Sequence, residues 1–283
     1  MLAHLDNETV FKKAFTNKAV FKAFVKDIVG IDIEVDKIET EKRFKPKMGN
    51  IDMVFDIFAE SIDQRVVIEI QRIDYDYNFD RFLGYFISAI LEQQRRSADY
   101  TIARQVYMII VLTAPYKIDP VTHTIFKDEV LISSCDPRNL KDESIPVYGH
   151  KLIFLNPNFR QEITPPNYRD WLDLIYESIH NPEDYKVNLN NEGIRMAVEL
   201  IDFDNLDAEE VRQSKINEQK KVVLRLMEQK GFEVGIEVGK KEGIEVGKKD
   251  SQLEIATAMK QNGVDIHLIV KYTGLTQTEV EAI

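Results

Sequence analysis

The chain has 283 residues, of which 44% are hydrophobic, and its formal net charge at pH 7 is −11. This length accommodates one substantial core with accessory parts, and the hydrophobic content excludes wholesale disorder. The acidic balance argues against a protein that coats nucleic acid nonspecifically, because such binding relies on clustered Lys and Arg.

The cellular setting is predicted from what the chain lacks. Its one cysteine, Cys135, cannot form an internal disulfide, which suits a reducing cytoplasm. Residues 1–13 have no apolar stretch behind a basic tip, as a signal peptide would. The longest apolar run, at 106–114, is shorter than the ~20 residues of a membrane-spanning helix. We expect a cytoplasmic protein with no membrane partner.

The first part of the chain reads as helix followed by strands. Residues 7–29 have helical spacing of apolar side chains, with a break near Thr16 and Asn17. Strands are predicted at 35–44, 51–58 and 66–71. A polar turn at 60–64 joins the last two strands, which predicts an antiparallel hairpin. In it, Ile51, Met53, Phe55 and Ile57 are expected to face the core.

The next elements complete an α/β pattern. A helix is predicted at 79–96, with an apolar stripe formed by Phe82, Leu83, Phe86, Ile87, Ile90 and Leu91. Residues 105–113 form a continuous apolar run, typical of a strand buried on both faces. Residues 114–150 show no readable pattern; 151–156 predict a strand and 168–179 a helix. The order αβββαβ predicts a mixed β-sheet flanked by helices.

The C-terminal part has a different texture. From residue 207 the chain is charged and helical, and glycine recurs every four residues at 231, 235, 239, 243 and 247. Because glycine costs about 1 kcal/mol per helix position relative to alanine, this repeat indicates either close packing along a glycine seam or a pliable linker. Residues 251–283 read as short helices, and VKYTGLTQTEV resembles a helix-turn-helix. We predict three parts: 1–206, 207–250 and 251–283.

Polar residues on the predicted hairpin suggest chemistry. In the strand 66–71 (VVIEIQ), Glu69 and Gln71 share a face, and Asp52 lies on the polar face of the neighbouring strand. Two carboxylates held close resist ionising together, and a divalent cation removes that conflict. Magnesium favours such oxygen ligands and completes its shell with water and phosphate. The backbone carbonyl of Ile70 is a further candidate ligand, and Gln71 could hold the attacking water.

The spacing of these residues does not by itself distinguish a metal site from other arrangements. Polar residues on one face of a hairpin are most often a solvent-exposed face. Asp56 shares the face of Asp52, and periodicity cannot choose between them. Lys42, Arg43, Lys45 and Lys47 precede the hairpin and form either a local basic patch for DNA or a solvated loop. The five histidines show no zinc-ligand spacing, and there is no P-loop or GxSxG motif.

Several motifs, in order along the chain, resemble one family. These are ETVFKKAF near the start, GNIDMVFDI, VVIEIQ, FDRFLGYFISAILEQQ, the glycine repeat and the terminal IATAMKQNGVDIHLIVKYTGLTQTEVEAI. Together they resemble the PD-(D/E)xK nuclease superfamily, in its transposase-associated, recombination-promoting Rpn-type branch. The resemblance covers nearly the whole chain and implies a restriction-endonuclease-like core with a helical C-terminal extension.

The resemblance also implies roles for individual residues. The family's strand aspartate matches Asp52 rather than Asp56, its glutamate matches Glu69, and its acidic residue on the first helix matches Glu8. At the position where the superfamily usually has lysine, this chain has Gln71, and glutamine is common there in this branch. The implied activity is a magnesium-dependent DNA endonuclease, with manganese as a substitute, linked to recombination or transposition.

Two other functions are weighed against the nuclease. The lysine lost at position 71 leaves open a weak or inactive nuclease fold that binds DNA or a protein. A homo-oligomer formed through the C-terminal helix is a further expectation, because the glycine repeat offers a surface for close helix contact.

Overall fold

The computed structural model describes residues 1–44, 53–71, 79–94, 101–114, 122 and 124–283. The chain divides into two compact units, residues 1–219 and 220–283. Predictions that concern 45–52, including those for Ile51 and Asp52, lie outside the described residues.

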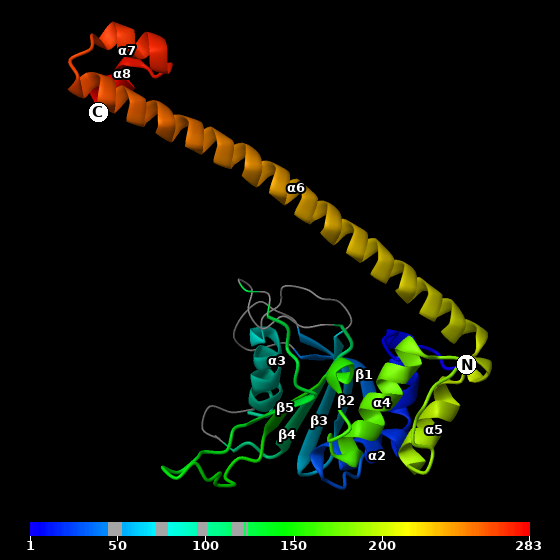
Figure 1. The fold of residues 1–283 in the computed structure, drawn as a ribbon. Coiled ribbons are helices and arrows are strands. Elements are labelled where there is room, and N and C mark those ends of the chain that lie inside the picture. The colour runs from blue at the N-terminus through cyan, green and yellow to red at the C-terminus, as the bar shows by residue number, and fades with distance from the viewer. Residues whose placement is uncertain (45–52, 72–78, 95–100, 115–121, 123) are drawn as a thin grey trace. The chain divides into compact units, whose positions relative to one another are not determined.

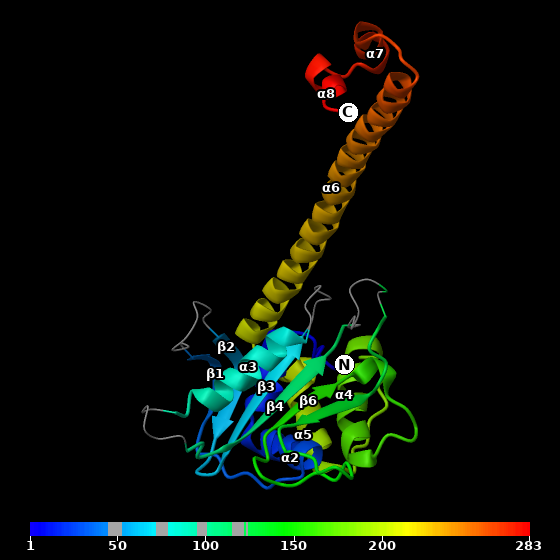
Figure 2. The ribbon, with the colours of Figure 1, turned by 90° about the vertical axis from the view of Figure 1, so that its left-hand side faces the viewer.

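The first unit contains a six-stranded mixed sheet with strand order β1-β2-β3-β4-β6-β5 (Figure 2). The strands are β1 (Ile38–Phe44), β2 (Met53–Glu60), β3 (Gln64–Gln71), β4 (Gln105–Leu112), β5 (Val130–Ser134) and β6 (Lys151–Leu155). The two central pairings, β3 with β4 and β4 with β6, are parallel, and the other pairings are antiparallel. The predicted mixed sheet and the β2–β3 hairpin are confirmed.

Helices cover both faces of this sheet (Figure 1). The helices of the unit are α1 (Glu8–Thr16), α2 (Lys18–Val29), α3 (Asp80–Leu91), α4 (Pro166–His180) and α5 (Glu192–Ile201), with the short 3-10 helices η1 (Pro157–Phe159) and η2 (Phe203–Asn205). One apolar core lies between the sheet and α1, α2, α4 and α5, and it includes Trp171. A second core joins the opposite face to α3. The predicted α/β architecture is therefore confirmed.

The break predicted near Thr16 and Asn17 is a helix boundary. Asn17 has extended backbone angles, φ −65° and ψ 122°, and its side-chain oxygen accepts hydrogen bonds from the amides of Ala19 and Val20. Asparagine is favoured as an N-cap because it satisfies amides that have no partner inside the helix. The predicted helical segment 7–29 is thus divided at the predicted break into two helices, α1 and α2.

Helix α3 contacts the sheet through a narrower face than predicted. Phe82, Phe86 and Ala89 are buried, whereas Leu83, Ile87 and Leu91 are 47%, 43% and 51% exposed. The predicted helix is confirmed, but only part of its predicted apolar stripe is buried. One face of α3 has a sheet to pack against, and the stripe of Leu83, Ile87 and Leu91 is directed away from that contact.

Two elements were missed. Strand β5 lies at the sheet edge within the region that showed no pattern, and four of its five residues are exposed. An edge strand without a buried face has no alternation of apolar and polar residues to detect. Helix α5 lies in 181–206, where no element was predicted, although Asn191 caps it and its buried residues include Ile194, Ala197 and Val198.

Helix α6 (Ala208–Gln261) begins just after the predicted boundary at 206 and is continuous across the predicted boundary at 250. Its first turns belong to the first unit, where the Ser214 carbonyl accepts a hydrogen bond from Asn7 Nδ2 (2.9 Å) and Asn217 Nδ2 donates to Thr9 Oγ1 (3.0 Å). The end of α6 packs with α7 (Ile266–Thr273) and α8 (Gln277–Glu281) around Ala256, Ile269, Leu275 and Val280. The boundaries at 206 and 250 stay predictions.

Candidate nuclease site

The site begins where the β2–β3 hairpin opens. The regular pairing of the two strands runs from Glu60 opposite Arg65 to Ile57 opposite Ile68. Beyond that pair, side chains replace the backbone ladder. The Asp56 amide donates to Glu69 Oε1 (2.9 Å), and the Ile70 amide donates to Asp56 Oδ2 (3.0 Å). Each carboxylate is therefore held by the backbone of the opposite strand.

The other neighbour of β2 is irregular at the same level. Pairing of β1 with β2 sets Thr40 opposite Ile57 and Lys42 opposite Phe55, which leaves Glu41 across from Asp56. Glu41 has φ +52°, in the left-handed region that non-glycine residues rarely adopt. Phe55 and Ile57 then belong to different cores, so the prediction that they share a face is wrong. Backbone irregularity of this kind is not visible in the apolar pattern.

Glu69 and Gln71 are buried beneath α3. They are 6% and 7% exposed, and Val67, on the same face of β3, packs in the core that includes Phe82 and Phe86 of α3. From the first turn of α3, Arg81 Nη1 lies 3.4 Å from Gln71 Oε1. The alternative interpretation of these polar residues as a solvent-exposed face is therefore wrong.

Helix α1 brings two further charges to the same end of the sheet. Glu8 stands in its first turn, after the N-cap Asn7. The ammonium of Lys12, one turn later, lies 2.6 Å from Glu8 Oε1 and 3.0 Å from Glu41 Oε1. The spacing of four residues places Glu8 and Lys12 on one face of the helix.

The charges at this site perturb one another. The pKa of Glu69 is raised well above the usual value, first by burial and then by the negative charge of Asp56, while the amide of Asp56 and the charges of Arg81 and Lys12 oppose the rise. Burial lowers the pKa of Lys12, but hydrogen bonds to Glu8 and Glu41 and the charges of Glu8 and Asp56 outweigh burial and raise it. Two carboxylates are thus forced together where ionising both is costly.

The donor set suits a hard divalent cation. Magnesium commonly takes one or two protein carboxylates together with water and phosphate, and Asp56 and Glu69 supply such a pair. Within the described part of the chain, no group of three or more His, Cys, Asp or Glu side chains is arranged to hold a metal. A two-carboxylate site that shares its ion with substrate phosphate requires no larger cluster.

The predicted site residues have different outcomes. Glu69 and Gln71 lie together on the α3 side of the sheet. Glu8 contacts Lys12, and the charge of Lys12 acts on Asp56 and Glu69. Asp52 lies outside the described residues, so its role stays a prediction, as does the Ile70 carbonyl as a ligand. Lys12 and Arg81 were not singled out from the sequence, although the Glu8–Lys12 spacing is a helix-pair signal.

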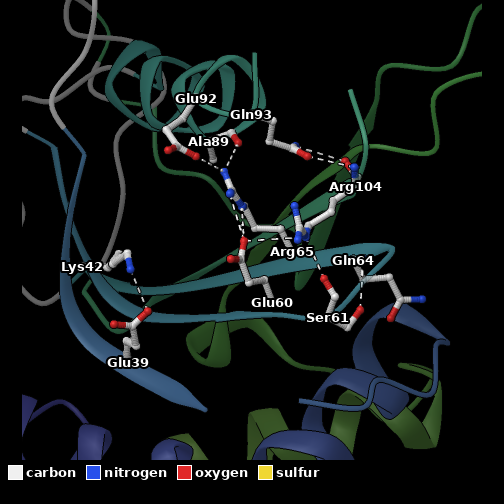
Figure 3. Close-up of polar contacts among 10 residues, drawn as sticks. All are labelled: Glu39, Lys42, Glu60, Ser61, Gln64, Arg65, Ala89, Glu92, Gln93 and Arg104. Carbon is white, nitrogen blue, oxygen red and sulfur yellow. Dashed lines mark hydrogen bonds and ion pairs between the residues drawn. The ribbon is translucent and has the colours of Figure 1, made fainter. Parts of the chain in front are cut away.

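A second charged cluster lies nearer the β2–β3 turn (Figure 3). The guanidinium of Arg65, whose side chain is 5% exposed, contacts Glu60 (2.9 Å), Glu92 (3.0 Å) and the carbonyl of Ala89 (2.8 Å). The ring centroids of Phe44 and Phe58 each lie 5.2 Å from the central carbon (Cζ) of this guanidinium. The guanidinium thus contacts Glu60 of the hairpin and, at the end of α3, Ala89 and Glu92, so the cluster joins α3 to the hairpin.

The predicted basic patch is only partly described. Lys42 lies 2.7 Å from Glu39 Oε1 and near the ring of Phe58, so its charge is offset locally. Lys45 and Lys47 lie outside the described residues. His150 accepts a hydrogen bond from the Val106 amide (2.9 Å), a structural role.

The second unit ends in a compact helical motif. Asp265 caps α7, Gly274 ends it with φ +76°, and Thr276 with Glu279 forms a capping box at α8. Glycine is favoured at such a helix end because a left-handed residue there costs it little. This turn between two short helices matches the predicted helix-turn-helix.

Comparison with protein families decides the relationship. Residues 6–225 match the PD-(D/E)XK nuclease family transposase model. The chain belongs to this family. Residues 249–283 of this PD-(D/E)XK family member match the C-terminal HTH domain of the Rpn/YhgA-like nuclease family. The family resemblance and the helix-turn-helix predicted from the sequence are both confirmed. Searches of curated proteins and of solved structures find no match.

None of the helices in the described ranges is long and apolar enough to cross a membrane.

Proposed function

We propose that this chain is a magnesium-dependent DNA endonuclease that hydrolyses phosphodiester bonds in recombination or transposition. The observation that carries the proposal is the mutual hydrogen bonding of Asp56 and Glu69 to opposite strands at the open end of the hairpin. Family membership supplies the reaction class, and the carboxylates of buried Glu69 and half-buried Asp56 supply ligands for the ion.

Each residue of the site has a proposed part. Asp56 and Glu69 would hold magnesium or manganese, with the Ile70 carbonyl as a further ligand. A bound ion orients a water and stabilises negative charge on a phosphoryl oxygen. Arg81 orients the Gln71 amide, which is proposed to position the attacking water. Glu8 is proposed to act through its contact with Lys12.

Two aspartates compete for the role of metal ligand. The contacts of Asp56 with Glu69 and Ile70 support Asp56, whereas the family resemblance favours Asp52. Nicking of supercoiled plasmid in magnesium, compared across Glu69→Gln, Asp56→Asn and Asp52→Asn, separates the two. We expect Glu69→Gln and Asp56→Asn to lose at least about 100-fold in rate, the scale of removing a group that stabilises transition-state charge.

The matched control is Asp63→Asn, an exposed carboxylate in the turn of the same hairpin. It is expected to leave nicking unchanged, and circular dichroism checks the fold of each variant. Loss of activity in Asp52→Asn but not Asp56→Asn would return the assignment to Asp52. Cleavage that survives in Glu69→Gln would contradict the proposed metal site, and a parent protein that cleaves no DNA in magnesium or manganese would contradict the nuclease proposal itself.

A second candidate is a nuclease fold that binds DNA or a protein without cutting. Gln71 and the net charge of −11 favour it, because neither draws in a phosphate as a lysine would. Tight DNA binding with no cleavage in either magnesium or manganese would support this alternative. The proposed DNA partner of the C-terminal unit rests on its helix-turn-helix match.

We further propose self-association through α6. Val222, Val223, Leu226 and Met227 are each about half exposed or more, and a side chain added at any of the five repeat glycines would meet open space. Exposed apolar residues spaced along a helix favour pairing with another helix. Sedimentation equilibrium should give a multimer for the full chain and a monomer for a chain ending at residue 219. Equal oligomeric states would contradict the proposal.

A further inference from the structure

The candidate site carries an excess of negative charge. Asp56 and Glu69 contact each other's strands, and Glu8 and Glu41 lie around Lys12 beside them. A phosphodiester substrate is itself an anion. Position 71 contributes a neutral amide, so within the described residues the positive charge that offsets these groups comes from another element.

Lys12 is held where that charge is needed. Its side chain is 16% exposed, and its ammonium lies 3.0 Å from the carboxylate of Glu41. Glu41 stands between Thr40 and Lys42, which pair with Ile57 and Phe55 on either side of Asp56. Glu8 holds the same ammonium from within α1, at 2.6 Å. An ammonium has three donors, and these two contacts use two of them. Lys12 is therefore fixed between helix and sheet at the level of Asp56.

The neighbouring lysine shows what a structural ion pair on this helix looks like. Lys13 is almost equally shielded, at 17% exposure, but its ammonium contacts Glu210 and the carbonyl of Asn205. It ties α1 to the start of α6 and contacts none of the four site carboxylates. Two adjacent lysines thus have the same chemistry, similar burial and different surroundings.

Among the residues that the structure describes, Arg81 is the other cation at the site. Its guanidinium contacts Gln71 and lies 5.2 Å from the ring of Tyr85, on the α3 side of the sheet. Its contact with a neutral amide suits orientation of Gln71, whereas Lys12 contacts carboxylates directly.

We propose that Lys12 is a positioning residue that supplies the positive charge of the nuclease site, an inference that rests on the proposed function. Its ammonium offsets the Asp56–Glu69 pair, holds Glu8 and Glu41 in place and favours the approach of a phosphate. The same charge repels a divalent cation at the two carboxylates. Removing it therefore strengthens metal binding and weakens catalysis, two effects of opposite sign.

The test measures both effects on the full-length protein. Lys12→Met removes the charge, Lys12→Gln removes it but keeps a hydrogen-bond donor, and Lys12→Arg keeps it. Calorimetric titration with manganese alone gives the metal affinity, and plasmid nicking gives the rate. We expect Lys12→Met and Lys12→Gln to bind manganese about 3- to 10-fold more tightly, as loss of one nearby charge in a polar site predicts.

The same two variants are expected to nick DNA at least about 10-fold more slowly, the usual scale for one electrostatic group in catalysis. Lys12→Arg should recover most of both properties, and Lys13→Met should change neither. If Lys12→Met does not fold, Lys12→Gln and Lys12→Arg decide the comparison. A purely structural role for Lys12 would lower metal affinity and rate together, or leave both unchanged, and either result overturns the inference.

This inference and the proposed function fail in different ways. A parent protein that binds manganese but never cleaves DNA refutes the nuclease, and the manganese affinities still judge Lys12. A parent that cleaves while Lys12→Gln keeps normal metal affinity refutes the role of Lys12 alone. If Arg81→Met, rather than Lys12→Met, produces tighter manganese binding with slower cleavage, the charge belongs to α3 and the proposal for Lys12 is overturned.

Discussion

The character of single residues at this site follows from burial. Glu69 is a carboxylate on the face of β3 that packs beneath α3, and the amide of Asp56 and the charges of Arg81 and Lys12 only partly relieve the cost of its ionisation. A raised pKa at a buried group that lies near another negative charge is typical of functional sites, where stability is exchanged for reactivity.

This cost predicts a pH dependence of folding. Because the folded-state pKa of Glu69 is raised above the usual 4.5, the stabilisation from this group is complete below that value and is lost as pH rises through the folded pKa. Without metal, Glu69→Gln should therefore melt at a higher temperature than the parent protein, by a margin that grows with pH. Differential scanning calorimetry across about pH 5 to 9 measures this.

Manganese supplies the control for that experiment. Binding to the folded state alone raises its melting temperature, so the ion should stabilise the parent and leave Glu69→Gln almost unchanged. A parent protein whose melting temperature exceeds that of Glu69→Gln throughout the pH range would contradict the assignment of Glu69 as a costly buried acid.

At the scale of elements, the position of α3 decides what the hairpin can do. Phe82 and Phe86 pack on the sheet, and Arg65 holds the last turn of α3 through the Ala89 carbonyl and Glu92. This anchoring keeps Arg81, at the other end of the helix, beside Gln71. Helix α3 thus covers Glu69 and orients Gln71 at once.

Loss of the Arg65 anchor is predicted to destabilise the first unit. Arg65→Met leaves Glu92 and the Ala89 carbonyl without their cation and Glu60 with only the longer contact to Arg104 (3.8 Å), although both carboxylates are 39% exposed and can be partly hydrated. We expect a loss of about 2–3 kcal/mol, below the usual cost of breaking a fully buried pair. The midpoint temperature of thermal unfolding should fall by about 5–10 °C for a chain of this size.

The matched control for Arg65 is Arg138→Met. Arg138 is 59% exposed and pairs with Asp142 at the surface, so its loss should cost less than about 1 kcal/mol. Equal effects of the two substitutions would show that Arg65 does not anchor α3.

At the scale of the whole molecule, α6 belongs to both units. Its first turns contact α1 through Asn7, Thr9 and Lys13, next to Glu8 and Lys12 of the candidate site. The start of α6 therefore supports the helix that carries these charges, whereas the terminal motif has a core of its own.

This arrangement predicts where the chain can be shortened. A chain ending at residue 219 keeps the contacts of Glu210, Ser214 and Asn217 and should unfold at the temperature of the first unit in the full protein. A chain ending at 206 lacks two side-chain hydrogen bonds and an ion pair, and we expect it to lose about 1–3 kcal/mol. Calorimetry on both compares them, and equal stability would contradict a supporting role for the start of α6.

Most elements and their order follow from the sequence alone, because each of these elements has a local periodicity of apolar residues. The apolar run of β4, the hairpin around residues 60–64 and the helix-turn-helix at the end were all predicted from spacing. Glu69 and Gln71 were identified in the same way, as polar residues in an otherwise apolar strand. Strand β5 and helix α5 were missed, the former because an exposed edge strand has no buried face to leave a pattern.

The surroundings of Glu69 and Gln71 depend on tertiary contacts. Burial of Glu69 depends on which face α3 covers, and the contact of Asp56 with Ile70 depends on an irregular strand pairing at Glu41. Lys12 reaches the site because α1 packs over β1 and β2. Such relations join residues far apart in the chain, and local periodicity holds no record of them.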